Sequence, residues 1–165
     1  MKRGVTSTDA RHDGFIEVLA QYPQLRLIQD RSFEQYDVGA VRSDAVELIG
    51  GLAERVGIFA VNESVTAGLL MALRKAGKGD AFVFVGFDDN PRLRQAVLDG
   101  QIRALVVQQP RLMGVLGVRY AVDALDGKTV PAQVDVPFSL LVRSAPPNGM
   151  LRLGSQDVPT LSVGP

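Results

Sequence analysis

The chain has 165 residues, which fits one domain of ordinary size or slightly more. Hydrophobic residues make up 46% of the sequence and charged residues 22%, a globular composition and not a disordered one. Basic and acidic residues number 18 each, so no excess positive charge argues for nucleic acid or anionic lipid, and the lack of cysteine excludes disulfides, thiolate metal sites and a cysteine nucleophile.

Helix-like and strand-like segments alternate along the chain. Apolar spacing predicts helices at about 9–21, 37–54, 64–76, 90–100 and 110–125, and strands at 25–28, 58–61, 81–85, 102–107 and 134–142. Asn90-Pro91 has the residue types of a helix N-cap followed by a first helical residue. From Ser144 onward the sequence contains prolines and no periodicity, so an irregular tail is expected over 144–165.

The alternation of strands and helices also predicts the architecture. Strands separated by helices of this length form right-handed βαβ units with a parallel sheet between helical layers. The strand candidates are apolar at consecutive positions, as expected where both faces of a strand are buried. The predicted fold class is therefore α/β: an open three-layer αβα sandwich with a mostly parallel sheet.

Polar residues follow three of the predicted strands. Asn62 comes after the strand at 58–61, Asp88 after the strand that leads into Phe87, and Gln108 after the strand at 102–107. Ligands of open parallel sheets bind beyond the carboxyl ends of the strands. A carboxylate, two amides and an aromatic ring suit a neutral polyhydroxylated ligand, a sugar, without performing chemistry on it. The alternative is that Asn62 and Asp88 merely cap the helices that follow them.

Several segments match a known family in order and spacing. The chain resembles type I periplasmic sugar-binding proteins, the ribose-binding group in particular, through ARHDGF at 10–15, FAVNES at 59–64, VGFDD at 85–89, VVQQP at 106–110 and ALDGKTVPA at 124–132. The resemblance spans about residues 5 to 143. It implies the periplasmic-binding-protein-like fold, in which two lobes close on a sugar.

The resemblance also implies which residues touch the sugar. They are Arg11, Tyr36, Asn62, Phe87, Asp88 and Gln108. For the aromatic contact ahead of the helix at 37–54, Phe33 competes with Tyr36. The planar fork of an arginine can hold two sugar oxygens at once, whereas the alternative for Arg11 is a surface position on the first helix.

The same resemblance implies an incomplete fold, with the first lobe largely missing. Residues 1–143 would form a partial binding-protein domain, with the second lobe at about 4–108 and 134–142, while 110–132 would belong to the absent first lobe. The helix at 110–125 would then expose four or five large apolar side chains, a loss of roughly 5–10 kcal/mol against total stabilities of about 5–15 kcal/mol. The isolated chain is expected to self-associate or to need a complementary fragment.

The implied function is recognition of a monosaccharide as the substrate-binding component of an ABC importer, with a membrane permease as partner. Catalysis, cofactors and metals are not expected: the one histidine, His12, is expected to be solvated, and the adjacent carboxylates of Asp88 and Asp89 should diverge. The family location is the periplasm. As written, Met1-Lys2-Arg3 is not followed by an apolar run, so the sequence carries no export signal and is expected to stay in the cytoplasm.

One alternative function remains open. The effector-binding core of a lac-repressor-type transcriptional regulator has the same fold and a segment similar to VGFDD. Nucleic acid is expected as a partner only under this alternative. The VVQQP segment and the Gly127-Lys128 turn before Val130-Pro131 resemble the transport group more closely.

Overall fold

The structure is a computed structural model of the chain. It describes residues 5–33, 37–52, 56–79, 81–144, 150–153 and 156–162, with side chains described up to residue 144. The helices are α1 (Thr6–Leu19), α2 (Val38–Gly50), α3 (Glu63–Lys75), α4 (Pro91–Leu98) and α5 (Pro110–Leu125). The strands are β1 (Gly57–Phe59), β2 (Val83–Phe87), β3 (Ala104–Val107), β4 (Ser139–Val142), β5 (Met150–Leu153) and β6 (Gln156–Ser162).

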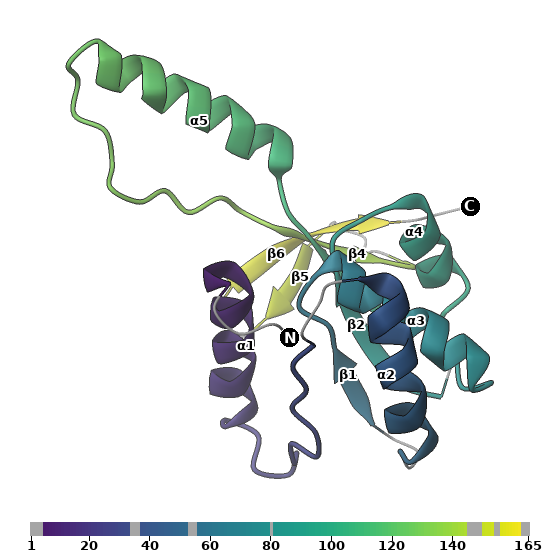
Figure 1. Cartoon of the computed structure of the whole chain (residues 1–165). Helices are drawn as coiled ribbons and strands as arrows, with labels where there is room; N and C mark the ends of the chain where they lie inside the picture. Colours follow the sequence, from purple (N-terminus) through teal and green to yellow (C-terminus); the bar gives the residue numbers. More distant parts are fainter. Residues whose placement is uncertain are drawn as a thin grey trace.

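The strands form one sheet in the order β1-β2-β3-β4-β6-β5. The β1–β2, β2–β3 and β4–β6 pairs are parallel, whereas β3–β4 and β5–β6 are antiparallel. Figure 1 shows α2, α3 and α4 on one face of the sheet and α1 on the other. The predicted α/β fold with helical layers around a mostly parallel sheet is confirmed.

Side-chain caps fix where the helices begin. Asp37 accepts a hydrogen bond from the backbone N–H of Ala40 at 2.9 Å at the start of α2. Asn90 accepts from the N–H groups of Arg92 and Leu93 at the start of α4, and Pro91 occupies the first helical position, as the sequence predicts. Such caps supply partners to backbone donors that have none inside the helix.

The packed body of the molecule consists of α2, α3 and α4 against β1, β2, β3 and β4. Its largest buried side chains include Ile49, Leu73, Phe84, Leu93, Leu105 and Leu141. The backbones of α2 and α3 approach closely at Gly68, where a Cβ atom would lie 2.6 Å from the Cβ of Val41. Any larger residue at Gly68 would therefore push the two helices apart.

Helix α5 stands outside this body. Figure 1 shows it projecting away from the sheet, with the following segment returning to β4. It contributes no buried residue, and Val118 and Leu125 are 68% and 88% exposed. In the described part of the chain, no helix is both long enough and apolar enough to cross a membrane.

Three sequence-based expectations differ from the structure. Residues 25–28 were expected to form a strand, but they have no strand assignment because no neighbouring strand pairs with them among the described residues. The predicted strand at 134–142 is formed only by its last four residues, β4, which pair with β3. The expectation of an irregular tail is wrong for 150–153 and 156–162, because β6 pairs in parallel with β4 and β5 pairs with β6.

Candidate functional site

The candidate site lies at one edge of the sheet. Asn62, Asp88 and Gln108 lie just beyond β1, β2 and β3, which are parallel neighbours. The carboxyl ends of these strands therefore meet at the same edge, where open α/β sheets bind their ligands. All three residues are partly buried.

A chain of hydrogen bonds joins Arg11 to this edge from the opposite helical layer. The guanidinium of Arg11, on α1, donates from Nη1 to the carbonyl oxygen of Val61 at 2.9 Å and from Nη2 to Oε1 of Gln108 at 3.1 Å. Gln108 in turn donates from Nε2 to Oδ1 of Asp88. Arginine, glutamine and aspartate therefore form one network, and Arg11 is part of the edge and not a solvated surface residue.

The ring of Phe87 packs against the guanidinium of Arg11. The Cζ atom of Arg11 lies 3.9 Å from the centroid of the Phe87 ring, a cation–π contact. The Phe87 side chain is only 8% exposed. In this arrangement the guanidinium covers the ring, so Phe87 orients Arg11 and offers little open face to a ligand.

The backbone of Asp88 takes an unusual conformation. Its φ is 66°, in the left-handed region where aspartate and asparagine are tolerated better than most residues. Its N–H donates to the carbonyl oxygen of Val106 at 2.8 Å, which holds the end of β2 against β3. Its carboxylate Oδ2 accepts from the N–H of Glu63 at 3.2 Å, the first residue of α3.

Asn62 has a capping role as well as a place at the edge. Its Oδ1 accepts from the N–H of Val65 at 2.9 Å, so it is the N-cap of α3. The capping alternative therefore applies to Asn62, whereas Asp88 does not cap α4, because Asn90 is the N-cap of that helix. Within the described residues, the amide Nδ2 of Asn62 makes no hydrogen bond and remains available as a donor.

Thr66 positions two of these residues and was missed in the sequence. It is fully buried, and its Oγ1 donates to the carbonyl oxygen of Asn62 at 2.7 Å and accepts from the N–H of Phe87 at 3.0 Å. Gly86 is required beside it, because a Cβ atom there would lie 2.4 Å from Cγ2 of Thr66. The signal in the sequence that could have identified Thr66 is a hydroxyl residue four positions after Asn62, on the buried face of a predicted helix.

Two residues, Tyr36 and Phe33, compete for the second aromatic contact that the sequence predicts. Tyr36 lies outside the described residues. Its competitor Phe33 is 7% exposed and belongs to the hydrophobic core. Phe33 therefore packs in the core and offers little of its ring to a ligand.

Two further polar residues can be placed. The side chain of His12 is 14% exposed, with Nε2 3.0 Å from Oδ2 of Asp30, so the expectation that it is solvated is wrong. Asp89 forms an ion pair with Arg94 while Asp88 turns to Gln108, so the two adjacent carboxylates diverge. In the part of the chain that the structure describes, no group of three or more histidine and carboxylate side chains could hold a metal ion.

Comparison with known proteins identifies the family of the chain. The sequence profile described as "Periplasmic binding protein domain" matches residues 2–129. The chain belongs to this family. Over 86 residues it is 40% identical to the ribose import binding protein of Salmonella typhimurium, an alignment that covers 52% of this chain and 29% of that protein.

More extended relatives are less similar in sequence. The ribose import binding protein of Bacillus subtilis is 30% identical over 137 residues, which cover 83% of this chain and 43% of that protein. Among solved structures, the periplasmic component of an ABC-type sugar transport system from Hahella chejuensis superposes with a TM-score of 0.79 at 38% identity, over 85% of this chain and 50% of that one. The chain thus spans half or less of the length of these relatives.

Proposed function

We propose that the chain recognises a monosaccharide as part of the substrate-binding component of an ABC importer. The observation that carries this proposal is the hydrogen-bonded network of Arg11, Gln108 and Asp88 at the carboxyl edge of β2 and β3. The named relatives, which are sugar-import binding proteins, support the same function.

The network has the chemistry that a sugar requires. A carboxylate such as Asp88 accepts from hydroxyl groups at both oxygens, while the amides of Asn62 and Gln108 each donate and accept. A guanidinium presents its donors in a rigid plane, and the stacking of Arg11 on Phe87 fixes the direction of that plane. Groups held in place before the sugar arrives lose little freedom on binding, which favours affinity.

The proposed domain organisation limits that affinity. We take residues 4–108 and 134–142 as one lobe of a two-lobed protein, with 110–132 belonging to the other lobe and 144–165 following the first. A complete micromolar site has about −8 kcal/mol of binding free energy, so one lobe that supplies half the contacts corresponds to roughly millimolar binding. A polypeptide that supplies the other lobe would restore tighter binding.

Partners and location follow from the same proposal. The sugar is the ligand, a membrane ABC permease receives it, and the place of action is the periplasm, to which the family belongs. The chain holds and releases its ligand without catalysis. The transport function is favoured over the transcriptional regulator because the named relatives are import proteins.

The experiment that tests the proposal is a calorimetric titration with D-ribose, and with D-allose in parallel. The chain should bind one of them in the millimolar range, and Asp88→Asn should weaken binding at least tenfold because an amide accepts fewer hydroxyl protons than a carboxylate. Asparagine tolerates the left-handed backbone at this position, so the variant should remain folded.

The matched control is Asp123→Asn, the same chemical change at a residue of α5 that forms an ion pair with Lys128. It should leave sugar binding unchanged. Equal affinities of the chain and Asp88→Asn for every sugar that binds would contradict the proposed site.

A further inference from the structure

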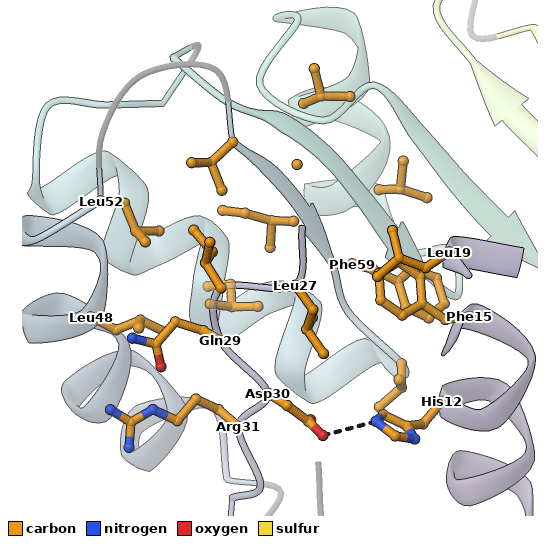
Figure 2. Close-up of a pocket in the computed structure, with 18 of the residues that line it drawn as sticks. His12, Phe15, Leu19, Leu27, Gln29, Asp30, Arg31, Leu48, Leu52 and Phe59 are labelled. Atoms are coloured by element: carbon orange, nitrogen blue, oxygen red, sulfur yellow. Dashed lines mark hydrogen bonds and ion pairs between the residues drawn. The ribbon is translucent and has the colours of Figure 1, made fainter. Parts of the chain in front are cut away.

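Helix α1 buries little of its surface against the sheet. Thr8 is its one buried residue, whereas α3 buries seven. Phe15 stacks on Phe59 of β1, with ring centroids 5.2 Å apart and an angle of 9° between the ring planes (Figure 2). Further contacts come from two consecutive residues: Arg11 reaches the sheet edge, and His12 reaches the segment that follows α1. The position of Arg11 therefore depends on how firmly α1 is held.

His12 connects α1 to the segment between α1 and α2. Its ring lies between two carboxylates: Nε2 is 3.0 Å from Oδ2 of Asp30, and Nδ1 is 3.1 Å from Oδ1 of Asp13. Figure 2 shows the imidazole directed from α1 toward Asp30. The side chain of His12 is 14% exposed, that of Asp30 39% and that of Asp13 71%. The contact with Asp30 is therefore screened less by solvent than the contact with Asp13.

Two carboxylates around one imidazole require a proton on each ring nitrogen. A neutral imidazole has one N–H donor and one nitrogen that can only accept, whereas an imidazolium donates from both nitrogens. Because ionised carboxylates accept and do not donate, one nitrogen of a neutral ring would face an oxygen with which it cannot bond. Both contacts of His12 are hydrogen bonds when the ring is positively charged, and opposite charges then strengthen each of them.

The charged groups around the imidazole come from α1 and from the segment after it. On α1, Asp9 lies one turn before the imidazole and Asp13 directly follows it. On the segment, Arg26, Asp30 and Arg31 line the cavity beside the ring, and Figure 2 shows the guanidinium of Arg31 directed away from it. The residues of β1, α2 and α3 that line this cavity are uncharged. The charge of the ring is therefore balanced mainly by Asp13 and Asp30.

We propose that His12 is a positioning residue for Arg11. As an imidazolium it ties α1 to Asp30 and so holds the guanidinium at the sheet edge. When the proton is lost, the tie loosens, and the guanidinium is less often in the place where a sugar would meet it. The consequence for sugar binding rests on the proposed function, whereas the tie between α1 and the segment does not.

The composition assigns a pH dependence of this kind to one side chain. The sequence has a single histidine and no cysteine. Histidine is the side chain whose charge ordinarily changes between about pH 5 and about pH 8. A ligand binds more tightly to the protonation state that holds its site in order, so the affinity for sugar should fall as the pH rises through this range.

The first experiment needs no sugar. Hydrogen exchange of the α1 amides in the whole chain, corrected for the intrinsic effect of pH on exchange, measures how often α1 opens. The protection factors of α1 should fall about threefold between about pH 5.5 and about pH 8, while those of α3 should not change. His12→Gln should remove this dependence because glutamine does not titrate. Asp30→Asn should also remove it, because an amide can pair with either form of the ring.

Two further variants separate the charge of the ring from general effects of substitution. His12→Lys keeps a positive charge throughout this pH range and should keep α1 protected at both pH values. The matched control is Asp99→Asn, the same chemical change as Asp30→Asn at the end of α4, where Asp99 contacts Gln95. It should retain the pH dependence of the unaltered chain.

The second experiment repeats the calorimetric titration with D-ribose and D-allose at both pH values. The dissociation constant should rise about threefold at the higher pH in the unaltered chain and stay constant in His12→Gln. Protection of α1 that does not change with pH, or a pH dependence that persists in His12→Gln, would overturn the proposal. So would a sugar that binds with the same affinity at both pH values. Protection of α1 that depends on pH, without binding of any sugar, would support the tie and contradict the proposed function instead.

Discussion

Helices α3 and α5 have similar lengths and similar apolar stripes but opposite surroundings. α3 has 13 residues and buries seven of them, whereas α5 has 16 residues and buries none. Local sequence sets both helices, because each has helical spacing of apolar residues. The difference teaches that amphipathic spacing specifies a buried face without specifying what buries it. For α5, that partner is not among the described residues.

The largest expected effect compares one substitution in the two helices. Leu73→Ala on α3 removes a side chain with no exposed surface and should lower the free energy of unfolding by about 2–5 kcal/mol. Leu125→Ala on α5, where leucine is 88% exposed, should change it by less than about 0.5 kcal/mol. Urea unfolding followed by circular dichroism measures both, and equal losses would show that α5 is packed in solution.

A smaller effect concerns self-association through α5. The exposed apolar side chains of α5 should drive contact between copies, so Val118→Glu should weaken the association constant about tenfold, or about 1.4 kcal/mol. Sedimentation velocity at several concentrations measures this. Met71→Glu, at a 39% exposed position on α3, is the control and should leave association unchanged. A folded monomer at every concentration would contradict the prediction that the exposed apolar side chains of α5 drive self-association.

Elements with local signals were predictable from the sequence. Asn90-Pro91 fixed the start of α4 because capping depends on neighbouring residues alone. The α5 bounds Pro110–Leu125 coincide with the predicted helix, since a proline opens it and the Asp126-Gly127 turn follows its end. The polar residues after β1, β2 and β3 were predictable as one edge, because strand order in βαβ units places consecutive strands together.

Features that depend on distant partners were not predictable. β6 contains Pro159, a poor strand signal, and forms through pairing with β4. Residues 25–28 have the composition of a strand, but they remain unpaired, because a strand needs a neighbour and none of the described strands pairs with them. The contact of His12 with Asp30 crosses 18 positions of the chain, and no local pattern marks it.

The most direct test of the central claim is an NMR titration of the chain with D-ribose, with amide shifts followed residue by residue. If the sheet edge holds the sugar, the shifts should concentrate at Asn62, Glu63, Asp88 and Gln108, with α5 and residues 25–29 unaffected. The Asp88→Asn variant should lose these shifts at the same sugar concentration. Shifts centred on Leu27 and Leu52 instead of this edge, or an unchanged pattern in the variant, would contradict the assignment of this edge as the sugar site.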